Sequence, residues 1–96
     1  MAVLMTIEFE ASKDQYDEVD KKLDVEANPP DGLIVHTAED LGDGKMRVVD
    51  VWESAEQLGA FTNGPLMQAM TEVMGEPDPD SANPPEVREL HNVVKP

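Results

Sequence analysis

Residues 33–53, "LIVHTAEDLGDGKMRVVDVWE", decide the fold of this chain. Two runs rich in β-branched residues, 33–41 and 45–53, are separated by the Gly-Asp-Gly sequence at 42–44. Glycine supplies the positive φ angles that tight hairpin turns require. The pattern therefore predicts two antiparallel strands joined by a short turn.

On each side of this hairpin the sequence predicts a helix that begins at a serine. Ser12 and Ser54 are each followed three residues later by glutamine, the spacing of a capping box, in which side chains bond the free N–H groups of the first turn. The first helix is expected to end before Asn28, because two prolines follow it. The second is expected to be interrupted at 63–65, "NGP", and to resume as an apolar stripe up to Gly75.

Residues 2–10, "AVLMTIEFE", and 86–95, "EVRELHNVVK", are predicted to be the outer strands. Residues 76–85, rich in proline and aspartate, are predicted to form a surface loop. The order β-α-β-β-α-β indicates a ferredoxin-like α+β fold, with a four-stranded antiparallel sheet and both helices on one face. We expect residues 1–96 to form a single domain, because this length is typical of one domain.

Apolar residues occupy both faces of the predicted strands, since successive side chains point to opposite sides. In the strand 45–53, Asp50 and Trp52 share one face, and Val49 and Val51 share the other. Two helices can cover only one face of such a sheet. We therefore predict a homodimer in which two copies pack through their sheet faces.

The same alternation, applied to the strand 33–41, places Leu33 and Val35 on the face opposite Ile34 and Ala38. It does not decide which face of the sheet carries a histidine, because the register of this strand against its neighbour is unknown from the sequence. This question is left for the structure.

The composition narrows the possible partners. There are 21 Asp and Glu against 7 Lys and Arg, a net charge of −14, so neither nucleic acid nor an anionic membrane surface is expected to bind. The chain has no cysteine, which excludes disulfides and thiolate chemistry. No apolar run is long enough to span a membrane, and the N-terminus lacks the basic flank of a signal peptide, so a cytoplasmic location is expected.

His36 and His91, both expected within strands, are the candidate catalytic bases, since histidine is the usual proton acceptor near neutral pH. Their strands are expected at opposite edges of the sheet, so the two are not expected to act together in one monomer. Each is also compatible with a purely structural role. No His-x-His spacing or similar ligand pattern occurs, and neither a metal nor another cofactor is expected.

Asp50 lies on the face of Trp52 and is either hydrogen-bonded in a pocket or placed near solvent. Arg47 and Arg88 are the only arginines, and each is a candidate partner for this acid or for a ligand carboxylate. Trp52 is either a pocket wall that stacks on an aromatic ligand or a core ring. Further candidates for binding a small apolar or aromatic molecule, or for plain core, are Tyr16, Phe61, Met67, Met70 and Met74.

This element order, together with "DVWES" at 50–54, "AEQLGAF" at 55–61 and the Gly-Pro step before "LMQAM", resembles the dimeric α+β barrel superfamily. The nearest resemblance within it is to the antibiotic biosynthesis monooxygenase (ABM)-like group, whose members include cofactor-independent monooxygenases and heme-degrading enzymes. Trp52 matches the strand tryptophan of the heme-degrading members. In those members the tryptophan works with a histidine on the following helix and an asparagine on the first strand. Here residues 55–75 contain no histidine and residues 2–10 contain no asparagine, so these two positions are not matched.

The resemblance implies a cofactor-independent monooxygenase that acts on an aromatic or polyketide-like substrate. The catalytic candidates are then Trp52, which the resemblance supports, and the two possible bases named above, His36 and His91. Two alternatives stay open. One is a polyketide cyclase-type enzyme, which needs the same base but no oxygen. The other is a non-catalytic binding or accessory dimer.

Overall fold

The computed structural model describes residues 1–75 and 84–96. Its elements, in chain order, are β1 (Val3–Glu10), α1 (Lys13–Leu23), β2 (Leu33–Gly42), β3 (Lys45–Trp52), α2 (Ala55–Phe61), the π-helix η1 (Thr62–Leu66), α3 (Met67–Met74) and β4 (Glu86–Glu89). No helix in these two described stretches is both long and apolar enough to cross a membrane.

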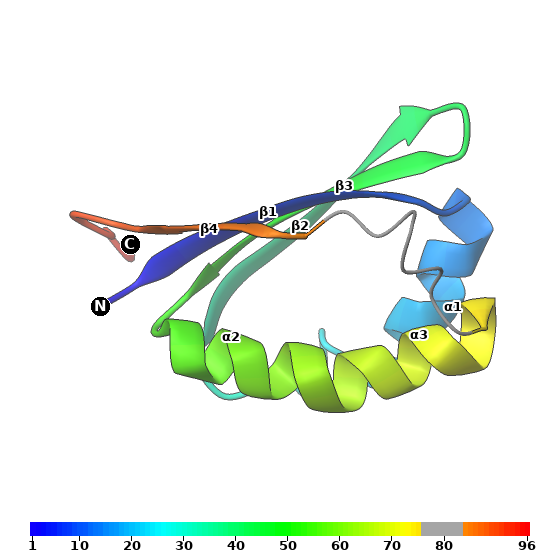
Figure 1. Cartoon of the computed structure of the whole chain (residues 1–96). Coiled ribbons are helices and arrows are strands. Elements are labelled where there is room, and N and C mark those ends of the chain that lie inside the picture. Colours follow the sequence, from blue (N-terminus) through cyan, green and yellow to red (C-terminus); the bar gives the residue numbers. More distant parts are fainter. Residues whose placement is uncertain (76–83) are drawn as a thin grey trace.

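The four strands form one antiparallel sheet in the order β2-β3-β1-β4. Both helical segments lie on the same side of it, and α2, η1 and α3 form one long rod below the strands (Figure 1). The predicted α+β fold is therefore confirmed, including the hairpin of β2 and β3 and the placement of β2 and β4 at opposite edges. Within residues 1–75 and 84–96, β2 and β4 each pair with one neighbouring strand only, and the other face of the sheet carries no helix or strand.

The serine caps form where the sequence predicts helix starts. Ser12 accepts a hydrogen bond from the backbone N–H of Gln15, whose side chain bonds back to the Ser12 N–H, so the capping box of α1 is complete. Ser54 likewise accepts from the backbone N–H of Gln57 at the start of α2. These bonds satisfy N–H groups that a helix leaves free in its first turn.

The expected interruption of the second helix does not occur. Residues 62–66 continue the helix as a π-helix, with Pro65 inside it. Proline lacks an N–H group and its ring crowds the preceding turn, and a wider turn relieves that conflict without ending the helix. The prediction of a break was therefore wrong, because a π-turn accommodates Pro65 within a continuous helical segment.

The last strand is shorter than predicted. β4 ends at Glu89, and residues 90–96 run on outside the sheet, although the Leu90 N–H still bonds to the Ala2 carbonyl. The strand prediction of 86–95 was too long, since β-rich composition continues past the last residue that has a partner on β1. Most of the predicted loop 76–85 lies outside the described residues.

A β-bulge at the start of β2 changes which residues face the helices. Leu33 is opposite Trp52, and Val35 is opposite Val51, so Ile34 is an extra residue between two pairs. Side chains of directly opposed residues share a face, so Leu33 and Val35 lie on opposite faces. The predicted alternation of β2 was wrong here, because one inserted residue reverses every later assignment.

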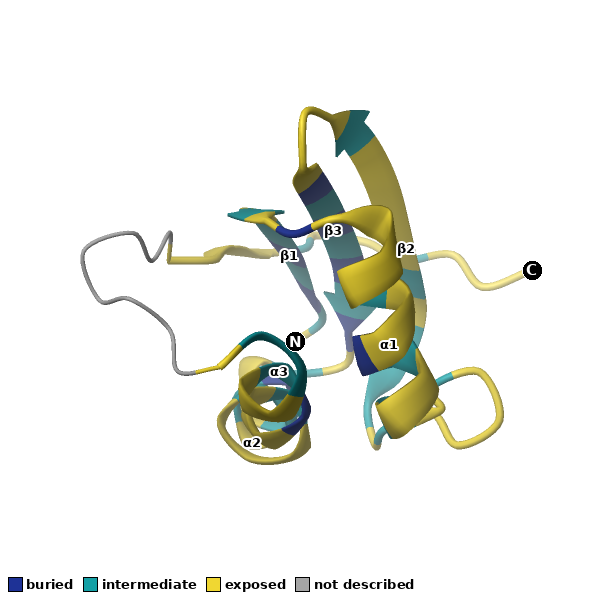
Figure 2. Cartoon of the chain, turned by 90° about the vertical axis from the view of Figure 1, so that its right-hand side faces the viewer, coloured by how far each residue is buried: buried dark blue, intermediate teal, exposed yellow. Residues whose placement is uncertain are grey.

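The core lies between the sheet and the helices. Figure 2 shows buried residues on β1, β3, α1 and the α2–α3 rod, while most of β2 and of the helix surfaces is exposed. The central cluster, which holds the fully buried Trp52 ring, consists of Val3, Met5, Val48, Trp52 and Leu58.

The outer face of the sheet changes from apolar to charged along its length. Leu4, Val51 and Val35 form one row across β1, β3 and β2. Two rows further on, Arg47 lies between Glu8 and Glu39 and pairs with both. The prediction that both faces are apolar is therefore correct for one end of the outer face only.

Gly32 gives the first testable consequence of this fold. Its φ is +90°, and a Cβ there would lie 2.5 Å from Gln57 Cδ and 2.9 Å from Gln57 Cβ, so Gly32→Ala is expected to disturb the α2 cap as well as strain the backbone. Gly42→Ala is the matched control, since Gly42 has φ +83° and open space around it. We expect Gly32→Ala to lower the free energy of unfolding by about 1 kcal/mol more than Gly42→Ala, because an N-cap contributes about that amount. Urea denaturation measures the free energy of unfolding of both variants. Equal losses would contradict a steric conflict between a Cβ at position 32 and the Gln57 side chain.

Candidate functional site

A buried carboxylate is the centre of the candidate site. Asp50, on β3, is only 5% exposed. One of its oxygens, Oδ1, lies 2.7 Å from His36 Nδ1, and the other, Oδ2, accepts a hydrogen bond of 3.3 Å from Trp52 Nε1. Both oxygens therefore have partners, which is the condition under which a buried carboxylate is tolerated.

The group continues from His36 to Tyr16. The Tyr16 hydroxyl lies 2.7 Å from His36 Nε2. When the imidazole is neutral, its Nδ1–H donates to Asp50 and its Nε2 accepts from the hydroxyl. When the imidazole is protonated, Nε2–H donates to the hydroxyl oxygen instead. His36 can therefore gain or lose a proton at Nε2 without losing either contact.

Three elements bring these side chains together. The bulge at Ile34 turns His36 to the helix side and places it directly opposite Asp50, whereas a regular strand starting at Leu33 would have turned it away. Tyr16 comes from the first turn of α1, which the Ser12 cap fixes. The sequence named these residues separately but did not predict that they form one hydrogen-bonded chain.

The surroundings raise the pKa values of two of these groups. The hydrogen bond to Asp50 raises the pKa of His36 above its usual value, and partial burial opposes this only in part. Burial and the nearby carboxylates of Asp20, Asp50 and Asp17 raise the pKa of Tyr16 to about 12. Tyr16 therefore stays protonated at neutral pH, and a positive charge on His36 is favoured.

An apolar cavity of about 130 Å³ adjoins this group, between the sheet and the helices. Its walls also contain parts of Tyr16, Asp20, His36 and Asp50. The apolar side chains that line it are Met5, Ile7, Phe9, Ala11, Val19, Leu23, Val25, Pro30, Leu33, Val48, Trp52, Phe61, Leu66, Met70 and Met74. A cavity of similar size in another protein holds one benzene molecule, so this space suits about one aromatic ring.

A second, more open hollow lies beside the cavity at the β2 edge. The cavity and this hollow share Tyr16, Asp20, Val25, Leu33 and His36, so these side chains lie between the two spaces. We call this second hollow the edge groove. It extends along the chain segment after α1, where Glu26 and Pro29 contribute to its wall.

The predicted ligand-binding residues are mostly at the cavity. Tyr16, Asp50, Phe61, Met70 and Met74 line it. Met67, on the same helix stripe, is half exposed and is not part of the wall.

Trp52 has features of both readings that the sequence left open. It is a core ring, 1% exposed, and it also forms part of the cavity wall. Its ring centroid lies 5.5 Å from that of Phe61, and its N–H is bonded to Asp50.

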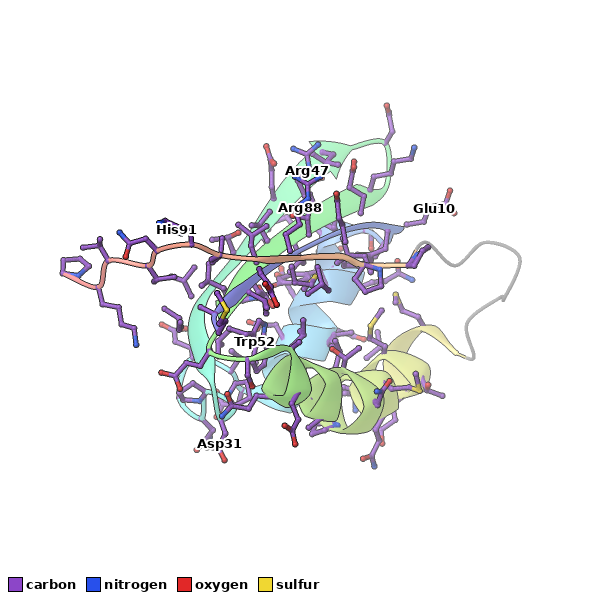
Figure 3. The ribbon with its side chains drawn as sticks, turned by 60° about the vertical axis from the view of Figure 1, so that its left-hand side comes forward. Glu10, Asp31, Arg47, Trp52, Arg88 and His91 are labelled. Atoms are coloured by element: carbon purple, nitrogen blue, oxygen red, sulfur yellow. The ribbon has the colours of Figure 1, made fainter. Side chains whose placement is uncertain are left out.

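His91 and the two arginines do not join the group. His91 is exposed, past the end of β4, rather than inside a strand as predicted. Figure 3 shows it beyond the end of that strand, far from Trp52, with Arg47 and Arg88 on the side of the sheet away from the α2–α3 rod. Arg47 pairs with Glu8 and Glu39 rather than with the buried acid.

Asp20 is the site residue that the sequence reading missed. It is one of several acidic residues of α1, but it is partly buried and lines both the cavity and the edge groove. Its position four residues after Tyr16 places it on the same helix face, and this spacing is the signal that would have identified it. Across residues 1–75 and 84–96, no group of three or more His, Asp or Glu side chains is arranged to hold a metal.

Comparison with solved structures places this geometry in a known fold. SnoaB, a cofactor-independent oxygenase from Streptomyces nogalater, matches with a TM-score of 0.65 at 12% identity, over 97% of this chain and 96% of that one. A protein from Chloroflexus aurantiacus J-10-fl, provisionally described as an antibiotic biosynthesis monooxygenase, matches with a TM-score of 0.65 at 18% identity, over 99% and 98%. The chain has the ABM-like fold.

The resemblance stated from the sequence is thereby confirmed at the level of fold. The protein NE2512 of unknown function from Nitrosomonas europaea is also similar, with a TM-score of 0.64 at 22% identity, over 99% of this chain and 93% of that one. Identities this low show a shared ABM-like fold and nothing finer. No family model and no curated protein sequence matches the chain.

The raised pKa of His36 predicts a pH-dependent stability. Its contribution is fully present below the unfolded pKa of about 6.5 and is lost as the pH rises through the higher folded pKa. The difference in the free energy of unfolding between the parent and His36→Gln should therefore narrow from acidic to alkaline pH. His91→Gln is the control, and it should keep the pH dependence of the parent. If the difference in the free energy of unfolding between the parent and His36→Gln stays constant with pH, the hydrogen bond to Asp50 does not raise the pKa of His36.

Proposed function

We propose that this ABM-like protein binds a small aromatic molecule and acts as a cofactor-independent monooxygenase on a phenolic or polyketide-like substrate. One observation carries the proposal: the hydrogen-bonded chain of Tyr16, His36 and Asp50 lies in the wall of an apolar, ring-sized cavity. A proton acceptor whose charged form is stabilised, next to an apolar space, is an arrangement that supports deprotonation of such a substrate.

Proton transfer is the first step. His36 Nε2 is the acceptor, and Asp50 stabilises the imidazolium that forms. Because the Tyr16 hydroxyl already occupies Nε2, it relays the proton: it donates its own proton to His36 as it accepts one from the substrate. Tyr16 is neutral before and after the step, which is consistent with its raised pKa.

Dioxygen is the co-substrate of the second step. The carbanion, or its phenolate form, gives two electrons to dioxygen, and a C–O bond and a peroxide anion form. The peroxide takes back the proton from His36. Loss of the second hydrogen of that carbon as a proton, with cleavage of the O–O bond, releases water and leaves a carbonyl. A CH₂ group and O₂ thus become C=O and H₂O, and dioxygen is reduced by four electrons.

The remaining side chains shape the site. Trp52 acts through Asp50, whose second oxygen it holds, and is therefore a positioning residue as well as part of the wall. Met70 and Met74 supply an adaptable apolar wall. The cavity suits one ring, and the edge groove offers room for the remainder of a larger substrate.

The activity is tested by oxygen uptake with an anthrone-type substrate. We expect His36→Ala to lower kcat by about 100-fold or more, because a general base contributes at least that factor. Tyr16→Phe should lower kcat with a smaller effect on KM, since it removes the relay. His91→Ala is the control and should retain the parent rate. Parent-like turnover by His36→Ala would refute the proposal, and product formation without oxygen uptake would indicate cyclisation instead.

We further propose that the protein is a homodimer joined through the outer face of the sheet. Support comes from the row of Leu4, Val51 and Val35, which no other part of the described chain covers. Val35 is 49% exposed, and a second copy would bury this row against its own.

Light scattering tests the dimer. At micromolar concentration the parent should have twice the mass of one chain, and Val51→Glu should shift it to a monomer, because a charge in an apolar interface is costly. Glu39→Gln, at the charged end of the same face, should remain dimeric. A monomeric parent would contradict the proposed dimer.

A further inference from the structure

Acidic side chains outnumber basic ones in the walls of the cavity and the edge groove. Their walls contain three carboxylates, those of Asp20, Glu26 and Asp50, and neither lysine nor arginine. Residues 76–83, which lie outside the described part, contain no lysine or arginine in the sequence either. A substrate therefore meets a negative potential on both sides of the Tyr16–His36 pair.

The negative charge of these walls disfavours the substrate anion that the proposed reaction forms. When His36 takes a proton, its positive charge is already matched by Asp50, and the substrate anion has no further cation nearby. Among the described residues no hydrogen bond or ion pair engages the Asp20 carboxylate. Its field acts on the two groups that handle the proton, since it raises the pKa of both Tyr16 and His36. An anion is therefore disfavoured unless a positive charge arrives with it.

We propose that the substrate supplies that charge: it is a phenol that bears a protonated amine, with the ring in the cavity and the amine in the edge groove next to Asp20. Asp20 is then the specificity-determining residue. It selects amine-bearing phenols over neutral ones and repels phenols that carry a carboxylate. This inference names the substrate class of the proposed function and rests on it.

Calorimetric titration with three single-ring phenols tests the proposal: tyramine carries an amine, 4-ethylphenol is neutral, and 3-(4-hydroxyphenyl)propionate carries a carboxylate. We expect tyramine to bind up to about fivefold more tightly than 4-ethylphenol, the factor that a partly exposed ion pair provides. The propionate should bind more weakly than 4-ethylphenol. The preference for tyramine should decline as salt is added, because salt screens such pairs.

Two variants test whether Asp20 is the residue that produces the preference for tyramine. Asp20→Asn should bring the tyramine affinity within about twofold of the 4-ethylphenol affinity measured on the same variant, since most of the ion-pair contribution is removed. Glu18→Gln removes the same charge from an exposed position of α1 outside both walls, and it should keep the parent preference.

The outcomes separate this inference from the proposed function. Equal binding of tyramine and 4-ethylphenol, or a preference that Asp20→Asn leaves intact, overturns the inference even if anthrones are oxidised. A preference for tyramine that depends on Asp20 supports the inference even if no oxygen is consumed, in which case the monooxygenase proposal alone falls. If none of the three phenols binds, both fail.

Discussion

The structure depends on how one buried charge is accommodated. Asp50 lies on β3, one of the two inner strands, where burial of an unpaired carboxylate would cost several kcal/mol. His36 and Trp52 each bond one of its oxygens, so the cost is offset only while the edge strand and the core ring keep their positions. The same carboxylate that the fold must satisfy makes His36 a stronger base. Stability and the proposed chemistry therefore rest on a single set of contacts.

Local signals predicted the fold well, and a non-local detail decided the site. The β2–β3 turn and the caps at Ser12 and Ser54 depend on a few neighbouring residues, so they were correct. Asp50 and His36 were each named as candidates, but which face carried His36 depended on the bulge at Ile34, which only strand pairing reveals. The strand around His91 was predicted from composition, and composition does not show whether a partner strand is present.

The electrostatic character of the site was also hidden by its surroundings in the sequence. Asp20 lies in a helix with many acidic residues, and such a pattern normally indicates a solvated face. Only the packing of α1 shows that this one carboxylate adjoins the cavity next to Tyr16. Net charge is a property of the whole surface, whereas selectivity depends on which single charge is next to the ligand, and the two cannot be separated from composition.

The π-helix η1 has a consequence for how this wall tolerates change. Phe61 and Leu66 both line the cavity although they are five positions apart, which is the repeat of a π-turn. An α-helix turns by about 100° per residue and would direct them apart. A regular α-helix of the same length at 62–66 would rotate α3 by roughly that angle and take Met70 and Met74 out of the wall, whereas a regular helix one residue shorter would keep both in place. Related chains that are one residue shorter at this segment would thus present the same face of α3 to the cavity without a π-turn.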